Sequence, residues 1–150
     1  MQVPVPVDTL KACPLFAGFT DTGLAIIAEI ARPRDLPQGM SLFLQGSAGD
    51  SLFVIESGTV EIFVGQGERA KVLCAVEAGG HLGELGLIRA GKRAVGARAR
   101  SACKLIELKR TDFNETLKTR PQACVKLMLN IFSAIEKRLE PVREDLLRLI

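Results

Sequence analysis

The sequence predicts a mainly β domain with a helical segment at each end. Between about residues 31 and 109, short apolar runs alternate with turn sequences such as Pro-Gln-Gly at 37–39 and Ser-Gly at 57–58. Many short strands separated by regular turns are typical of closed or two-layer β architectures rather than βαβ units. On both sides of this segment, apolar residues recur with the helical period. We therefore expect one domain over residues 1–150, a length that suffices for a hydrophobic core.

Local spacing and turn residues place the individual elements. Residues 15–30 are expected to form a helix, with Leu24 and Ile27 on one face and Thr20 or Asp21 as its N-cap. The expected strands share short apolar runs bounded by glycine and polar residues. They cover residues 41–44, 51–55, 60–64, 71–76, 97–99 and 104–108.

The C-terminal helical segment, about residues 111–149, carries a regular apolar stripe. Its members are spaced alternately by three and four residues, the a/d pattern of a coiled coil. We expect the first half of this stripe to pack on the β domain and the second half to pair with a second copy in a parallel homodimer. A helix packed wholly within one chain is the alternative. The stripe comprises Val125, Met128, Phe132, Ile135, Leu139, Val142, Leu146 and Leu149.

Two features of this segment oppose a simple coiled coil. Arg138 and Arg143 would bring like charges together between the two helices. Pro141 inside a helix removes a hydrogen bond and costs about 3 kcal/mol. Pro141 therefore either kinks the helix or begins a separate helical segment, which would make it a hinge.

Composition argues against several classes of protein. No apolar run approaches the roughly 18 residues of a membrane span, and the first residues lack the pattern of a signal peptide. We therefore expect a cytoplasmic protein that does not insert into a membrane. The cysteines Cys13, Cys74, Cys103 and Cys124 lie far apart without a C-x-x-C pair, so they predict buried free thiols rather than a metal site.

Positive charge is concentrated in one segment. Residues 87–110 carry eight Lys and Arg residues against one acidic residue, Glu107, although the net charge of the chain is only +3. Such a segment concentrates anions near it, but the net charge is too small to imply binding of nucleic acid by this chain. Most of these cations are expected on a solvated face, and Arg93 is the one we single out.

The candidate functional site lies in residues 79–100, GGHLGELGLIRAGKRAVGARAR. Glycines allow the backbone to approach a ligand closely, and a short helix beginning after Gly83 would direct N–H groups toward an anion. The guanidinium of Arg93 can pair with a phosphate, whereas the carboxylate of Glu84 accepts hydrogen bonds only. Together they predict a ligand that carries a phosphate and a hydroxyl, such as a sugar phosphate.

This pattern resembles the cyclic nucleotide-binding domain family. The resemblance rests on residues 39–60 (GMSLFLQGSAGDSLFVIESGTV), on the Gly-Glu-Leu-Gly-Leu run at 83–87 and on Arg93-Ala94. It extends over almost the whole chain and is closest in character to catabolite activator proteins and to regulatory subunits of cyclic-AMP-dependent protein kinase. It implies an eight-stranded antiparallel β-roll, or double-stranded β-helix, with an N-terminal helix and a long C-terminal helix.

The resemblance also implies roles for the residues of the site. Glu84 would accept a hydrogen bond from the ribose 2′-hydroxyl, Arg93 would pair with the cyclic phosphate, and the N–H groups of Gly83, Leu85 and Gly86 would hold the other phosphate oxygens. Ala94 and Val95 follow the arginine. Alanine at 94 favours cyclic AMP over cyclic GMP, because guanine-preferring members tend to carry a threonine there.

Other parts of the pocket are also implied by the resemblance. Ile62, Leu73 and Cys74 would form its wall, and Val142 or Arg143 would close over the base, although a solvated role for Arg143 is equally open. His81, where the family often has an aromatic residue, is expected to pack rather than to act chemically. No catalytic residue, metal ligand or resident cofactor is implied.

Three functions from different classes remain open. The first is a non-catalytic sensor of cyclic AMP that transmits binding through the C-terminal helix. The second is the ligand-binding half of a DNA-binding regulator or channel, which needs a further domain after Ile150. The third is a degenerate scaffold for dimers or partners, which would be favoured if Glu84 and Arg93 simply paired with each other. A nucleoside triphosphatase is not expected, because the Gly-x-x-x-x-Gly-Lys-Arg run at 86–93 lacks the Ser or Thr that binds magnesium.

Overall fold

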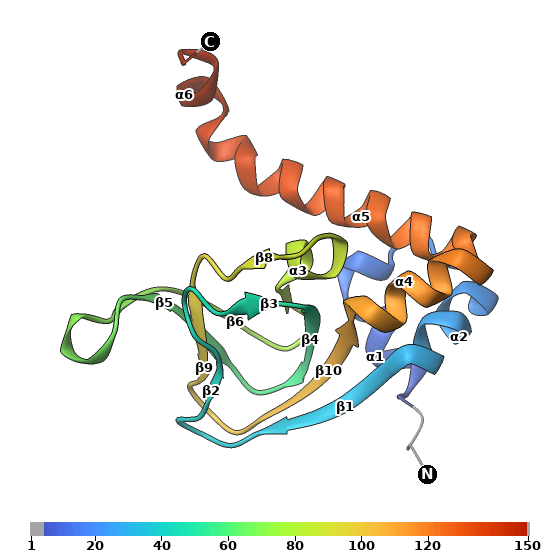
Figure 1. The fold of residues 1–150 in the computed structure, drawn as a ribbon, viewed down its shortest axis with the longest axis horizontal. Helices are drawn as coiled ribbons and strands as arrows, with labels where there is room; N and C mark the ends of the chain where they lie inside the picture. Colours follow the sequence, from blue (N-terminus) through green and yellow to red (C-terminus); the bar gives the residue numbers. More distant parts are fainter. Residues whose placement is uncertain (1–4, 150) are drawn as a thin grey trace.

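Two four-stranded antiparallel sheets form the centre of the computed structural model, which describes residues 5–149 (Figure 1). The two ends of the predicted domain, residues 1–4 and 150, lie outside the described residues. The first sheet has the order β1 (Ala31–Leu36), β10 (Cys103–Lys109), β4 (Ser51–Ser57) and β7 (His81–Leu82). The second has the order β2 (Ser41–Phe43), β9 (Gly96–Ala99), β5 (Val60–Val64) and β6 (Lys71–Val76).

The mainly β architecture with flanking helices is confirmed. Eight strands lie in the two larger sheets, and a further short pair joins β3 (Ala48–Gly49) to β8 (Gly91–Lys92). All six expected strands are present within one or two residues of their expected ends. The strand β1 was not among them because it contains Pro33 and charged residues; proline is tolerated there because β1 lies at the edge of its sheet.

Strand β4 separates two hydrophobic cores. Its residues alternate between faces, so Phe53 and Ile55 pack inside the roll with residues of the second sheet. Leu52 and Val54 point to the opposite side, where they pack against the helices. Both faces of β4 are therefore buried, which explains why residues 52–55 are continuously apolar instead of alternating.

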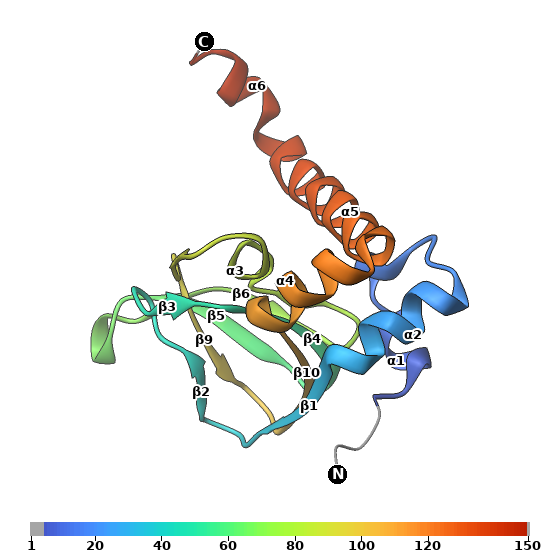
Figure 2. The same ribbon diagram turned by 45° about the vertical axis from the view of Figure 1, so that its right-hand side comes forward.

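Helices cover the outer face of the first sheet (Figure 2). The expected helix over residues 15–30 is divided into the 3-10 turn η1 (Pro14–Phe16) and α2 (Asp21–Ile30), and it is preceded by α1 (Val7–Lys11). Thr20 is the N-cap of α2, as expected, with its hydroxyl oxygen 3.0 Å from the Gly23 nitrogen. A further short helix, α3 (Glu84–Ile88), follows β7, and a 3-10 turn, η2 (Gly67–Arg69), forms the tip of the β5–β6 hairpin.

The C-terminal segment consists of several helices rather than one. After α4 (Arg110–Thr119) the chain breaks at Arg120, because the following Pro121 disfavours the helical conformation of its neighbour. The long helix α5 (Pro121–Leu139) then ends two residues before Pro141, which lies in the 3-10 turn η3 (Glu140–Val142) ahead of α6 (Arg143–Leu147). Pro141 thus lies at the junction of two helical segments. This is the second of the two expected alternatives, in which a separate helical segment begins near Pro141 instead of one kinked helix.

The buried face of α5 is not the predicted stripe. Leu127 and Ile131 are fully buried against the neighbouring helices, and the Asn130 side-chain amide donates to the Leu15 carbonyl at 2.7 Å. By contrast, Val125 and Phe132 of the stripe are 45% and 53% exposed. The expectation that the first half of the stripe packs on the β domain is therefore wrong for Val125 and Phe132, whereas Met128 and Ile135 are half-buried against the core.

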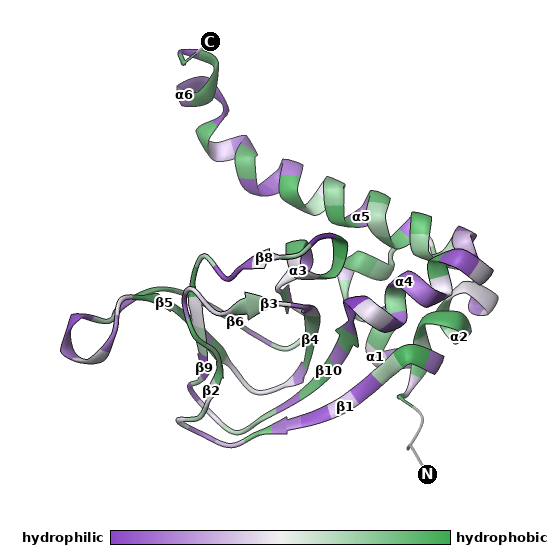
Figure 3. Ribbon diagram, viewed as in Figure 1, coloured by the Kyte–Doolittle hydropathy of each residue, from purple (hydrophilic) through white to green (hydrophobic). Residues whose placement is uncertain are grey.

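The exposed stripe continues to the end of the chain described. After the end of α5 the chain extends away from the sheets, and apolar residues recur along it through α6 (Figure 3). Its exposed members, between 42% and 81% accessible, are Leu139, Val142, Leu146 and Leu149. Of the helices formed by residues 5–149, none combines the length and the apolar character needed to cross a membrane.

Adjacent residues on α5 provide a test of this packing. Ile131→Ala removes a side chain with no exposed surface and should lower the free energy of unfolding by about 2–5 kcal/mol. Phe132→Ala, on the exposed face, should change it by less than about 1 kcal/mol in the monomer. Urea unfolding at low protein concentration measures both values, and equal losses would contradict the assignment of faces.

Candidate ligand-binding site

A cavity of about 690 Å³ lies between the second sheet, the segment from β7 to β9 and the last turns of α5. All of the predicted ligand-binding residues, 83–86 and 93–95, line it. Ile62 of β5 and Cys74 of β6 form part of its wall, as expected, and Ile135, Arg138 and Leu139 approach it from α5. The structure therefore brings together residues that are more than 70 positions apart in the chain.

Arg93 is the buried cation of the basic segment. Its residue is only 9% exposed, whereas the other seven cations of residues 87–110 are intermediate or exposed. The guanidinium donates from Nη2 to the Ser51 carbonyl at 2.8 Å. Its central carbon lies 4.3 Å from the ring centroid of Phe43, which is the geometry of a cation–π contact.

Glycines leave the space that this guanidinium occupies. A Cβ on Gly83 would lie 2.5 Å from Arg93 Nη1 and 2.7 Å from the Ser51 carbonyl oxygen. Gly83 also has φ +81°, a conformation that other residues rarely adopt. A Cβ on Gly49 would lie 3.0 Å from Arg93 Nε. The glycine pattern therefore serves the close packing around Arg93 as well as access to the cavity.

One buried nitrogen of the Arg93 guanidinium has no hydrogen-bond partner in the described part of the chain. Among residues 5–149, its Nε is the buried side-chain nitrogen or oxygen without a hydrogen-bond partner. Burial lowers the pKa of Arg93 below its ordinary value, with partial compensation from Asp50, Glu107 and Glu84. A guanidinium nevertheless stays charged at neutral pH. A buried cation that lines a cavity is suited to binding an anion.

Glu84, the first residue of α3, is the buried carboxylate of the site. Its side chain is 8% exposed and accepts hydrogen bonds from His81 Nδ1 and from Arg138, whose Nη2 lies 2.6 Å away. Burial alone would raise the pKa of Glu84, but the hydrogen bonds from His81 and Arg138 outweigh it and lower the pKa to about 2. Glu84 therefore remains an ionised acceptor at neutral pH.

Arg110 fixes the backbone of the site by hydrogen bonds to three carbonyl groups. Its Nη1 lies 2.9 Å from the Gly49 carbonyl oxygen and 3.0 Å from those of Gly86 and Arg89. These carbonyls belong to β3, to the middle of α3 and to the residue that caps the C-terminus of α3. Because Arg110 begins α4, it ties the β3 and α3 segments to the C-terminal helices.

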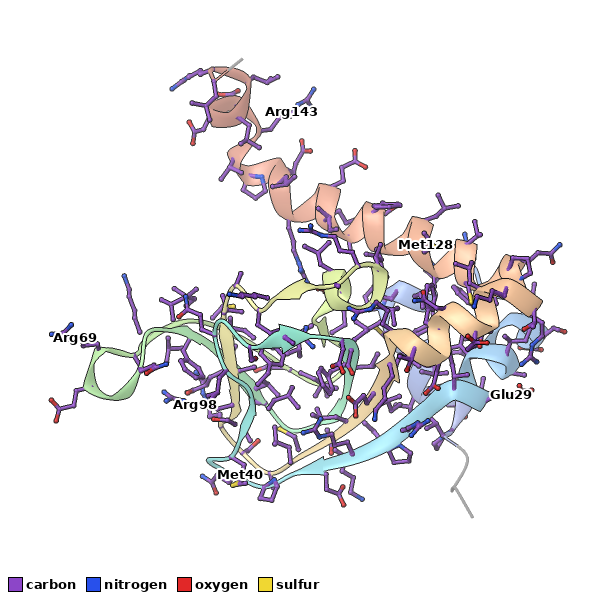
Figure 4. The ribbon with its side chains drawn as sticks, viewed as in Figure 1. Glu29, Met40, Arg69, Arg98, Met128 and Arg143 are labelled. Atoms are coloured by element: carbon purple, nitrogen blue, oxygen red, sulfur yellow. The ribbon has the colours of Figure 1, made fainter. Side chains whose placement is uncertain are left out.

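Several predicted positions need correction. Leu73 does not line the cavity and is 51% exposed. A β-bulge in the β5–β6 pairing leaves it without a partner on β5, because Cys74 pairs with Ile62 and Val72 pairs with Phe63. Val142 and Arg143 also lie outside the cavity, because the chain changes direction at η3, and Figure 4 shows Arg143 beyond α5 and away from the strands. Arg138 and Leu139, about one turn earlier, take their place.

Three further expectations change in the structure. His81 is not only a packing residue, since it donates to Glu84 and lines the cavity. Cys13, Cys103 and Cys124 are buried free thiols as expected, but Cys74 is exposed. The Gly86 N–H was expected to hold a phosphate oxygen, but it donates to the Gly83 carbonyl at 3.0 Å within the turn.

Arg138 and Arg110 are site residues that the sequence does not predict. In the sequence, Arg138 is a charge beside the apolar stripe, and Arg110 is one of eight basic residues. Nothing in their local spacing distinguishes them, because their partners lie 54 and up to 61 positions away. Within the part of the chain that the structure describes, no group of three or more His, Cys, Asp or Glu residues could hold a metal ion.

Comparison with known proteins identifies relatives of this arrangement. Residues 33–120 match the family model of the cyclic nucleotide-binding domain. The cyclic AMP receptor protein of Thermus thermophilus is 29% identical over 113 residues, which cover 75% of this chain and 52% of that protein. The chain thus spans about half the length of this relative.

Solved structures show the same fold. The N-terminal domain of a transcriptional regulator from Streptomyces coelicolor has a TM-score of 0.77 at 28% identity, covering 89% of this chain and 96% of that chain. A cyclic nucleotide-binding domain from Methylobacillus flagellatus has a TM-score of 0.81 at 16% identity, covering 100% of this chain and 89% of that chain. The second likeness concerns the fold alone.

The environment of Glu84 predicts a pH-dependent contribution to stability. Because its folded pKa of about 2 lies below the ordinary value, ionised Glu84 stabilises the fold at neutral pH, and this contribution disappears as the pH falls toward 2. Glu84→Gln should therefore lower the free energy of unfolding at pH 7 by on the order of 2 kcal/mol, and about half of this difference should be lost by pH 3.

Chemical unfolding at several pH values measures this difference. Glu68→Gln, at the exposed tip of the β5–β6 hairpin, is the matched control and should follow the wild type throughout. A Glu84→Gln deficit that is equal at pH 7 and pH 3 would show that the charge of Glu84 does not stabilise the fold.

Proposed function

We propose that this chain, which belongs to the cyclic nucleotide-binding domain family, is a non-catalytic sensor whose ligand is cyclic AMP. The observation that carries the proposal is the buried guanidinium of Arg93, which lines one cavity together with Glu84 and the glycine turn at 83–86. A cyclic phosphate would pair with this cation through charge-assisted hydrogen bonds. Residues 83–86 and 93–95 bind the ligand in this proposal, and no resident cofactor takes part.

Glu84 is the proposed partner of the ribose. It lines the same cavity as Arg93 and is ionised at neutral pH, so it can accept a hydrogen bond from a 2′-hydroxyl. The geometry is unlike that expected of a degenerate scaffold: Glu84 pairs with His81 and Arg138, whereas Arg93 donates to Ser51. The two charges are thus not paired with each other, and each is assigned to a different part of the ligand.

Ala94 supports cyclic AMP over cyclic GMP. Its methyl group lines the cavity next to Arg93 and offers no hydroxyl to the exocyclic amino group of guanine. The name of the Thermus thermophilus relative, a cyclic AMP receptor protein, points the same way.

The C-terminal helix is the proposed transmitter. Arg138 and Leu139 line the cavity and lie next to the η3 turn that contains Pro141. A ligand that favours one position of this turn over another would shift its population. The Streptomyces coelicolor relative is the N-terminal domain of a transcriptional regulator, so the ligand-binding half of such a regulator is a second candidate role.

A homodimer through the C-terminal segment completes the proposal. The exposed apolar residues of the second half of the stripe would be covered by the same residues of a second copy; they are Leu139, Val142, Leu146 and Leu149. Burial of these side chains in a parallel pair would place the two hinge turns side by side.

Substitution of Arg93 tests the binding function. Arg93→Ala removes the charge-assisted contact with the phosphate and should weaken cyclic AMP binding by about 100-fold. Isothermal titration calorimetry measures this change, with Arg100→Ala as a control, because exposed Arg100 pairs with Glu61 outside the cavity. Circular dichroism should establish that the variant is folded. A wild-type protein that gives no heat with millimolar cyclic AMP or cyclic GMP would contradict the proposal.

Charge placed in the stripe tests the dimer. Leu146→Glu puts a carboxylate on an exposed apolar position of α6 and should shift the protein from dimer to monomer in sedimentation velocity. Glu68→Lys, on the remote hairpin tip, should remain a dimer. A monomeric wild type at concentrations of about 100 µM would refute the dimer.

A further inference from the structure

We propose that Arg138 competes with the ligand for Glu84 and thereby couples ligand binding to release of the last turn of α5. In this structure, Arg138 holds the carboxylate that the ribose hydroxyl would use. The inference rests on the proposed function, because it assigns the displaced contact to a cyclic nucleotide. It adds a physical link between the cavity and the hinge.

The contact between the two residues is a two-point one. Arg138 Nη2 lies 2.6 Å from Glu84 Oε1, and Nη1 lies 3.3 Å from Oε2. Oε1 also accepts from His81 Nδ1. Since the Glu84 side chain is only 8% exposed, little of the carboxylate remains open to another donor. In this proposal a ribose hydroxyl replaces one of the donors already present instead of adding to them.

Arg138 is the donor that is more easily displaced. His81 lies on β7, whose pairing with β4 fixes its backbone opposite Val54, and its side chain is 9% exposed. The Arg138 side chain is 55% exposed and lies at the end of a helix, so its guanidinium can return to water at low cost. Glu84 would then exchange one donor for another and remain satisfied.

Release of Arg138 acts on a specific part of the chain. The first half of α5 is anchored by buried residues such as Leu127 and Ile131, and by the Asn130 hydrogen bonds to the N-terminal segment. Arg138 is the ion-pair contact from the last turn of α5 to the β-roll segment, and η3 follows two residues later. Breaking this contact frees the segment next to the hinge without disturbing the anchored half.

Competition has a reciprocal consequence. If ligand binding breaks the Arg138–Glu84 pair, removal of Arg138 must strengthen ligand binding, since the two events share one free energy. One partner of the pair, Glu84, is buried and the other, Arg138, is half-exposed. For the loss of such a pair we expect the affinity for cyclic AMP to rise by about 5–20-fold. The direct alternative, in which Arg138 contacts the nucleotide, predicts a loss of affinity instead.

Calorimetry with two nucleotides tests the competition. The full chain as wild type, Arg138→Ala and Arg138→Gln is titrated with cyclic AMP and with 2′-deoxy-cyclic AMP. Both variants should bind cyclic AMP about 5–20-fold more tightly than the wild type. They should bind the deoxy analogue with unchanged affinity, because this analogue leaves Glu84 to Arg138. Arg143→Ala is the matched control, an exposed arginine beyond the hinge whose removal should change neither affinity.

Hydrogen exchange of the last turn of α5 gives a second readout that does not depend on affinity. Amides of residues 134–139 should exchange faster in Arg138→Ala than in the wild type, and cyclic AMP should accelerate the same amides in the wild type. Weaker or unchanged cyclic AMP binding by the variants, or an equal gain with both nucleotides, overturns the competition alone. Failure of the wild type to bind either nucleotide overturns the proposed function and, with it, this inference.

Discussion

Burial of the Arg93 guanidinium is the constraint on which the rest of the site depends. A charged group can be buried only where hydrogen bonds and aromatic faces replace part of its hydration. Ser51 and Phe43 provide this replacement from β4 and β2, but Nε remains without a partner among residues 5–149. The fold thus holds a cation in place before any ligand contributes to it, which is the preorganisation that favours tight anion binding.

The surrounding architecture can be understood as support for this cation. Glycines at 49, 83 and 86 leave room for the guanidinium, and Arg110 fixes the carbonyls of the same segments. Glu84 is kept ionised in the same cavity by hydrogen bonds from His81 and Arg138. One face of the site is therefore fixed by the sheets, whereas the other is closed by a helix that ends at a hinge.

The sequence predicted the parts of the fold that depend on local patterns. Strand alternation, the Thr20 cap and the break near Pro141 each follow from neighbouring residues, and all three are present. The glycine pattern with Glu84 and Arg93 located the cavity. What could not be predicted depends on distant contacts: the bulge that turns Leu73 outward, and the pairing of Arg138 with Glu84. The apolar stripe predicted a helix correctly, but its packing face depends on which neighbours cover α5.

The central claim is that Arg93 is the anion-binding group, and its own Nε–H resonance tests this most directly. In ¹⁵N-labelled protein, the Arg93 Nε–H signal can be assigned by its disappearance in Arg93→Lys and then followed during titration with cyclic AMP. The account predicts that this signal shifts as the phosphate pairs with the guanidinium, and that the shift saturates with the calorimetric affinity. Binding of cyclic AMP with no change in the Arg93 signal would contradict it.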